Sequence, residues 1–147
     1  KERSGRWVCF REYYYSGRDE EQQKTNTEYA DDLEQWLAGI KPVKIIIDPS
    51  AASFIAELKE RGYTIKKAKN DVLDGIRFVA SLLNQDLIAI SDQCPNTIKE
   101  FRSYIWDQKA SEHGEDKPVK QHDHAMDALR YFCYTIIRKS GGISILK

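Results

Sequence analysis

The sequence predicts an α/β domain in which a largely parallel sheet is covered by helices. Short runs rich in isoleucine, valine and aromatic residues alternate with stretches whose apolar residues recur at the three-and-four spacing of a helix. The most apolar run, residues 43–48, contains three consecutive isoleucines, which is typical of a strand buried on both faces of a parallel sheet. The resulting order is strand then helix, repeated along the chain.

Composition indicates one globular domain with a sizeable core. Of its 147 residues, 41% are hydrophobic and 31% are charged, and the formal net charge is zero. A polyanionic partner would therefore have to contact a local basic patch. The sequence has three cysteines, which lie far apart in the chain, as expected for free thiols in a reducing compartment. With no signal-like start and no apolar run of membrane-spanning length, we expect a soluble intracellular domain.

The first strand and helix are predicted in the first forty residues. Residues 6–15 are rich in aromatic and β-forming residues and read as a strand, which needs a sheet neighbour that nothing before it supplies. Residues 27–37 form an amphipathic helix, which Asn26 or Thr27 can cap and Gly39 can end.

The second strand, residues 43–48, ends in a carboxylate, Asp48. Ser50 is expected to cap a helix over residues 51–61, which Gly62 closes. In open α/β sheets, ligands gather where the carboxyl ends of strands meet helix starts. Asp48 could be a simple turn residue before proline, but a carboxylate just past a buried strand has few inexpensive partners, so we favour a functional role.

The third strand, residues 63–69, carries a lysine cluster, and a helix starting at Asn70 or Asp71 continues to about residue 83. The candidate phosphate contacts of this region are Lys66, Lys67, Lys69 and, one to two turns into the helix, Arg77. Charged residues on an edge strand also prevent aggregation, and that explanation is equally compatible with the sequence.

Residues 87–91 are predicted as a further strand, and residues 95–102 as a helix that Pro95 starts. Residues 104–106 read as a final edge strand, followed by a polar surface loop over residues 107–120. Lys117 and Lys120 help to make this loop locally basic and are further candidate contacts of a DNA phosphate backbone.

The most distinctive stretch, residues 121–132, places acids and imidazoles at the start of a helix with a buried apolar stripe. On that helix Asp123 and Asp127 lie one turn apart on one face, with His124 three residues before Asp127. Two carboxylates this close repel each other unless a cation lies between them. The face is therefore either a metal site or a solvated helix start in which Asp123 is only a cap.

Three segments, residues 10–14, 47–51 and 123–131, resemble the carboxy-terminal nuclease domain of the large terminase subunit of tailed bacteriophages. The resemblance runs from about residue 6 to about residue 134. It implies the ribonuclease-H-like fold shared with Holliday-junction resolvases and retroviral integrases: a three-layer α/β domain whose mixed central sheet is flanked by helices. Residues 1–147 would then be a single nuclease domain.

The resemblance also implies an activity, metal-dependent endonucleolytic cutting of concatemeric double-stranded DNA during genome packaging. Asp48 resembles the family's second metal-binding acid and Asp127 its third, while His124 resembles the accompanying histidine and Asp123 is a less certain helper. Hard oxygen ligands suit Mg²⁺ or Mn²⁺, and two such ions roughly 3.5–4 Å apart could bridge a phosphate. DNA, the small terminase subunit and the portal would be the partners, in the cytoplasm of the infected host.

Two departures from the family pattern affect these expectations. The family's first acid lies on the first strand of the sheet and a second strand follows, and this chain starts too late to include them. The sheet would lack its central strand, and the cutting activity of this chain alone is in question. The sequence also contains no Gly-rich phosphate loop, so we expect no ATP hydrolysis.

Alternative interpretations remain open. The chain could be a non-catalytic module that holds DNA or docks on the packaging motor, or a resolvase-like or transposase-like nuclease of the same fold. A zinc site built from His113, His122 and His124 is more remote, because no cysteine has suitable spacing nearby.

Overall fold

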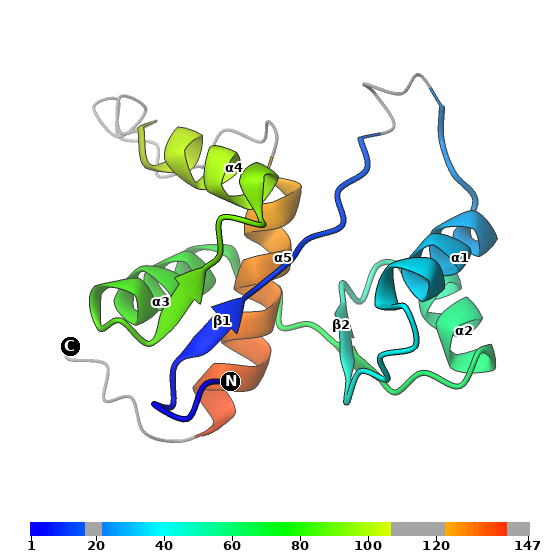
Figure 1. Ribbon diagram of the computed structural model, residues 1–147, viewed down its shortest axis with the longest axis horizontal. Coiled ribbons are helices and arrows are strands. Elements are labelled where there is room, and N and C mark those ends of the chain that lie inside the picture. Colours follow the sequence, from blue (N-terminus) through cyan, green and yellow to red (C-terminus); the bar gives the residue numbers. More distant parts are fainter. Residues whose placement is uncertain (17–21, 107–122, 141–147) are drawn as a thin grey trace.

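A computed structural model describes residues 1–16, 22–106 and 123–140 (Figure 1). In chain order the elements are β1 (Trp7–Cys9), α1 (Asn26–Leu37), β2 (Ile45–Ile47), α2 (Ala52–Glu60), β3 (Ile65–Lys67), α3 (Val72–Asn84), β4 (Ile88–Ile90), α4 (Pro95–Trp106) and α5 (His124–Phe132). The alternation of strands and helices confirms the α/β class. No helix in the described ranges is both long enough and apolar enough to span a membrane.

The strands form two parallel pairs on either side of α5. β1 pairs with β4, and β2 pairs with β3, as two separate two-stranded sheets. Figure 1 shows α5 standing between β1, with α3 beside it, and β2, with α1 and α2 beyond it. The half-sheet expected from the sequence is thus divided in two, and the antiparallel part of a mixed sheet is not seen among the described residues.

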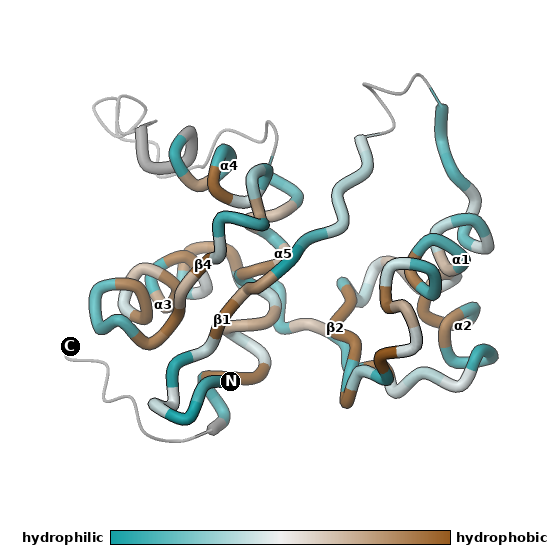
Figure 2. The backbone as a smooth tube through the Cα atoms, in the orientation of Figure 1, coloured by the Kyte–Doolittle hydropathy of each residue, from teal (hydrophilic) through white to brown (hydrophobic). Residues whose placement is uncertain are grey.

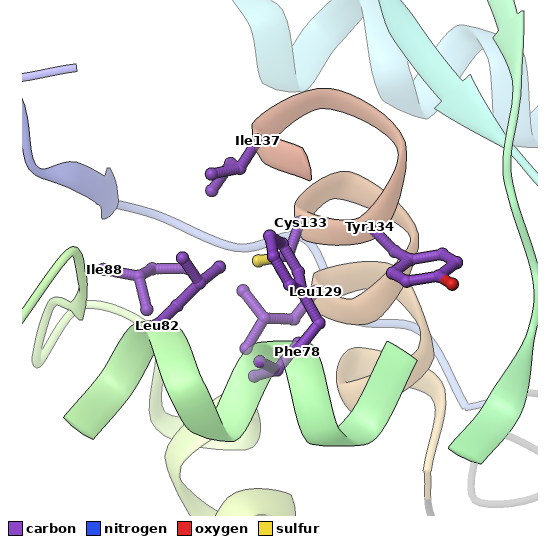
Figure 3. Packing of buried hydrophobic residues seen from close by; sticks show 8 residues of the cluster. Phe78, Leu82, Ile88, Leu129, Cys133, Tyr134 and Ile137 are labelled. Atoms are coloured by element: carbon purple, nitrogen blue, oxygen red, sulfur yellow. The ribbon is translucent and has the colours of Figure 1, made fainter. Parts of the chain in front are cut away.

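The main core lies where α5 packs against α3 and the β1–β4 sheet (Figure 3). Its buried residues are Phe78, Val79, Leu82, Ile88, Leu129, Cys133, Tyr134 and Ile137. In Figure 2 the strands β1 and β2 are hydrophobic, as are parts of α3 and α5. Full burial of a side chain of this kind contributes about 1.5–3 kcal/mol. The apolar stripe predicted for α5 is therefore what fixes this helix in the fold.

Beyond Phe132 the helix changes its geometry. It widens into a π-helix over Cys133–Ile137 and ends in a short 3-10 helix at Arg138–Ser140. The hydroxyl of Thr135, which is fully buried, accepts a hydrogen bond of 2.9 Å from the backbone N–H of Lys69. The π-helix thus connects α5 to the segment that follows β3.

Two strand predictions were wrong. Of the strand expected over residues 6–15, only Trp7–Cys9 pairs with a neighbour, because the chain then leaves the sheet and contacts α1 and α4 instead. Residues 104–106 belong to α4 and form no edge strand. A strand needs a neighbour to pair with, whereas helical hydrogen bonds are local, and neither glycine nor proline interrupts residues 96–106.

The starts of α1 and α2 also differ from the prediction. Thr25 caps α1, in a reciprocal capping box with Glu28, instead of Asn26 or Thr27. The N-cap of α2 is Ala51 and makes no side-chain hydrogen bond, so Ser50 is not the cap. Gly62 follows the end of α2 as expected, with φ of 86°, a conformation that glycine adopts without strain. At the end of α1 the left-handed C-cap is Ala38, with φ of 50°, and Gly39 follows it with φ of 83°.

Candidate metal centre at the start of helix α5

Asp48 lies directly after β2 and points toward α5. Its Oδ1 accepts a hydrogen bond of 2.8 Å from the backbone N–H of Ser50, and its Oδ2 accepts one of 2.5 Å from the Tyr131 hydroxyl. These hydrogen bonds, from Tyr131 first and then Ser50, hold the pKa of Asp48 below its ordinary value of 3.8. Asp48 is therefore a carboxylate at neutral pH, and each of its oxygens keeps a lone pair for a further ligand.

Asp127 lies in the first turn of α5 with its carboxylate partly open to solvent. Its side chain is 39% exposed, and its Oδ1 accepts a hydrogen bond of 2.6 Å from Nη2 of Arg130, three residues further along the helix. Its backbone N–H donates to the carbonyl of Asp123 in the first helical turn. One side of the carboxylate is thus held by the protein while the side chain remains accessible.

Arg130 is a buried cation fixed from several directions. Its side chain is only 6% exposed, and its Nη1 donates to the backbone carbonyls of Asn70 and Asp71, at 2.9 and 3.0 Å. Gly75 on α3 makes room for it, because a Cβ there would lie 2.7 Å from Cγ of Arg130. Arg130 therefore ties the start of α3 to Asp127.

Tyr131 brings the two candidate acids into one electrostatic environment. The pKa of its hydroxyl is raised to about 12 by burial, by the hydrogen bond to Asp48, and by the charges of Asp127 and Asp48. Tyr131 donates a hydrogen bond to Asp48 and lies one helical turn after Asp127, so the end of β2 meets α5 at this hydroxyl. Packing between α5 and β2 agrees with this placement.

The two other predicted site residues lie at the very start of α5. Asp123 occupies the N-cap position, but its side chain makes no capping hydrogen bond. His124 is exposed and lies one turn before Asp127 and two turns before Tyr131, along one stripe of the helix. The structure therefore gathers Asp48 and Asp127 around Tyr131 and leaves Asp123 and His124 at the edge of that group.

Glu100 on α4, not Asp123, satisfies the start of α5. Its Oε2 accepts hydrogen bonds from the backbone N–H groups of Ala125 and Met126, at 2.8 and 3.1 Å, and its Oε1 accepts one of 2.9 Å from the Tyr14 hydroxyl. Glu100 is 4% exposed. A buried carboxylate at a helix N-terminus is favoured by the helix dipole, so Glu100 anchors the turn that carries Asp127.

A large apolar cavity of about 660 Å³ opens between the two sheets. Val8 of β1 and Ile46 of β2 line it, and His124 lies on its wall at the start of α5. The cavity thus reaches from the facing edges of the two sheets to the candidate site.

The candidate side chains are of a type that binds hard divalent cations. Asp48 and Asp127 supply carboxylate oxygens, the ligands that Mg²⁺ and Mn²⁺ prefer. Within the described residues, however, no three His, Cys, Asp or Glu side chains converge as a group that could hold a metal. Asp48 and Asp127 therefore supply two carboxylates to this region, and no third such side chain joins them within the described residues. The zinc alternative cannot be placed, because His113 and His122 lie outside the described residues.

Of the predicted DNA contacts, two lysines belong to one basic cluster. Burial and the charges of Lys139, Lys44 and Lys69 lower the pKa of Lys66, so each of these three ammonium groups lies near that of Lys66. Lys67 is exposed on the same strand. The sequence did not suggest Lys44 or Lys139, because neither lies within the lysine-rich strand.

Arg77 does not extend this cluster. It lies on α3, 73% exposed, and its nearest acid is Asp74 at 3.9 Å on the same helix. α3 and the β2–β3 sheet flank α5 on different sides (Figure 1), and a contact of Arg77 with DNA remains a prediction. Lys117 and Lys120 lie outside the described residues.

Sequence reasoning missed the residues that hold the acids. Arg130 and Tyr131 follow Asp127 by three and four positions, the spacing at which helical side chains meet, so this signal was present in the sequence. Glu100 had no such signal, since its partners are 25 and 26 residues away in the chain.

Known proteins are similar to this chain in sequence and in fold. Residues 8–134 match the model of the family described as terminase RNaseH-like domain. The large terminase subunit of Escherichia phage T5 is 30% identical over 130 residues, which are 86% of this chain and 30% of that protein.

Solved structures of the large terminase of a thermophilic bacteriophage are also similar. One of them, in complex with ADP, matches with a TM-score of 0.83 and 54% identity over 90% of this chain and 34% of the other. A second crystal form of the same large terminase gives a TM-score of 0.82 and 53% identity. The chain spans about a third of the length of these relatives.

Proposed function

The chain belongs to the family of terminase RNaseH-like domains, and from this we propose that it cuts concatemeric phage DNA during genome packaging, as a metal-dependent endonuclease. Its fold is ribonuclease-H-like, and its sequence is that of the nuclease-like domain of a large terminase subunit. The substrate of the proposed reaction is double-stranded DNA, and its cofactor is Mg²⁺ or Mn²⁺.

The observation that carries this proposal is the meeting of Asp48 and Asp127 around Tyr131. They come from segments 79 residues apart, the end of β2 and the first turn of α5, yet both act on one hydroxyl. A bound cation stabilises two carboxylates that lie close to one another. Asp48 and Asp127 would hold the cation, with His124 nearby as a ligand or proton-handling group.

A divalent cation bound here would supply positive charge at the scissile phosphate and lower the pKa of water. The protein contributes fixed positions, because Tyr131 orients Asp48 and Arg130 orients Asp127. The cluster of Lys44, Lys66, Lys69 and Lys139 would contact the phosphate backbone. Such contacts carry little base specificity and make binding strongly dependent on salt.

The test is plasmid nicking by the complete natural polypeptide that contains this sequence, with Mn²⁺ and with EDTA. We expect Asp48→Asn and Asp127→Asn each to lower the nicking rate at least about 100-fold, because each removes a charged ligand. Glu60→Gln, which changes an exposed carboxylate of α2, is the matched control. Nicking that persists in both variants, or in EDTA, would refute the proposal.

The second candidate function is a DNA-holding or motor-docking module without catalysis. It is favoured by the absence, among the described residues, of a third acidic or imidazole side chain that completes the centre. DNA binding that depends on Lys66 and Lys69, without Mn²⁺ binding or nicking by the wild-type polypeptide, would support this alternative. The small terminase subunit and the portal are its proposed protein partners, in the host cytoplasm.

A further inference from the structure

We propose that Arg130 and Tyr131 are positioning residues for the metal centre, so that two neighbouring residues of α5 each hold one of its acids. This inference rests on the proposed function, since it assigns roles around Asp48 and Asp127. Neither residue would touch the cation itself. Their task is to fix the two carboxylates before a cation arrives, as hydrogen-bonded partners of metal-binding carboxylates do in general.

Tyr131 holds Asp48 through one donated hydrogen bond. Its hydroxyl meets Oδ2, while Ser50 holds Oδ1 from the other side. With both oxygens held, the Asp48 carboxylate cannot rotate freely, and its orientation toward α5 is determined by the Tyr131 ring. That ring is itself held, because the Arg130 guanidinium lies 4.8 Å from its centre.

Arg130 acts on Asp127 and cannot be a mobile cation that a metal displaces. A mobile competitor would need a flexible and solvated guanidinium, whereas this one is 6% exposed and hydrogen-bonded to the carbonyls of Asn70 and Asp71. Its aliphatic part is confined by α3 at Gly75. Arg130 therefore remains in place when a cation binds and stabilises one oxygen of Asp127.

Both assignments predict weaker cation binding in conservative variants that keep the fold. Tyr131→Phe removes one hydroxyl, and Arg130→Lys keeps the charge but loses the planar fork that reaches three acceptors. We expect each variant to weaken Mn²⁺ affinity about 10–100-fold, the usual consequence of removing a partner of a metal ligand. In nicking assays the Mn²⁺ concentration for half-maximal rate should rise more than the rate at saturating Mn²⁺ falls.

The controls are matched substitutions in the same helical segment. Tyr134→Phe changes a buried tyrosine of the core, and Arg138→Lys changes an exposed arginine that lies over the Tyr134 ring. Mn²⁺ affinity is measured by isothermal titration of the complete natural polypeptide without nucleotide, and the unfolding midpoint of every variant is recorded. Neither control should alter Mn²⁺ affinity.

The possible outcomes separate this inference from the proposed function. If wild type binds Mn²⁺ and Asp48→Asn and Asp127→Asn do not, while Tyr131→Phe and Arg130→Lys bind as tightly as wild type, the positioning roles are refuted and the metal centre stands. If wild type binds no Mn²⁺, the proposed function itself fails. Should Arg130→Lys unfold, Tyr131→Phe decides the question alone.

Discussion

At the scale of single residues, the shape of the site depends on an atom that is absent. Gly75 lies inside α3, where glycine costs about 1 kcal/mol relative to alanine. A Cβ at this position would lie 2.7 Å from Cγ and 2.8 Å from Cδ of Arg130. The guanidinium of Arg130 is fixed by hydrogen bonds, so moving these atoms of its aliphatic part would cost energy. Glycine is therefore required here by packing.

Replacing Gly75 with alanine should consequently destabilise the domain. We expect Gly75→Ala to lower the free energy of unfolding by about 1–3 kcal/mol, the typical cost of overpacking, although alanine is the better helix former. In an Arg130→Ala background the clash is gone, and the same change should be neutral or stabilising. Urea unfolding of the two single variants and the double variant measures this coupling. Additive effects would contradict the clash.

The sequence singles out the two candidate acids, Asp48 and Asp127, but not the residues that hold them. Asp48 stands out because it ends an apolar strand, and Asp127 because it borders an apolar stripe. Arg130 also lies beside that stripe, but charged side chains are almost never fully buried, so its burial was not expected. Once buried, Arg130 donates hydrogen bonds to the backbone carbonyls of Asn70 and Asp71. The position of these carbonyls depends on how α3 packs against α5.

At the scale of elements, the segment after β1 fixes α4 through a carboxylate. Oε1 of Glu12 accepts from the backbone N–H and side-chain amide of Asn96, and Oε2 from the N–H and hydroxyl of Thr97, all within 2.7–2.9 Å. Burial alone would raise the pKa of Glu12, but these hydrogen bonds outweigh it, and the pKa lies below 4.5. Glu12 thus anchors α4, which in turn carries Glu100 to the start of α5.

A pH-dependent contribution to stability follows from this lowered pKa. Since the folded pKa lies below the unfolded one, Glu12 contributes fully above about pH 4.5 and its contribution is lost as the pH falls through the folded value. We expect Glu12→Gln to cost about 1–2 kcal/mol at pH 7 and much less at pH 3. Urea unfolding at both pH values tests this, with Glu60→Gln as the control. An equal cost at both values would contradict the role of the charge.

Helices were predicted more accurately than strands for a physical reason. The apolar face of α1 and the glycines after α1 and α2 are local signals, and the structure confirms them. The extent of a strand depends on its neighbour, so the aromatic stretch after Trp7 could not reveal that only Trp7–Cys9 pairs. The last turn of α4 was missed for the same reason, because its Tyr, Ile and Trp favour a strand only where a partner exists.

At the scale of the whole molecule, two short sheets face each other across one cavity. In the β1–β4 ladder the backbone groups of Trp7 and Cys9 are paired, so alternation directs those of Val8 to the opposite edge. Ile46 is placed in the same way in β2, between Ile45 and Ile47. Both residues line the cavity, which leaves room for an extended segment between the sheets.

Amide exchange tests whether such a segment occupies this position. In the 147-residue chain alone we expect the amides of Val8 and Ile46 to exchange much faster than those of Cys9 and Ile47, which point into the ladders. In the complete natural polypeptide we expect both to be protected, because the ribonuclease-H-like fold has one central sheet. Amide exchange followed by NMR provides the measurement. Rapid exchange in both samples would show that the sheets remain separate.

Only the general arrangement of the strands and helices could be predicted from the sequence. The order of strands and helices and the proximity of β2 to α5 were predictable, because parallel strands require crossover helices. The division into two sheets was not, since no local pattern tells which strands become neighbours.

The wide turn at Cys133–Ile137 has a consequence for how such domains diverge. A π-helix holds one residue more than the α-helical turn it replaces, so it behaves as an inserted residue. In related lineages, loss of that residue would rotate Arg138 and Lys139 about the helix axis while Asp127 and its turn kept their place. Evolution could thus redirect the basic end of this helix toward new partners without altering its acidic end.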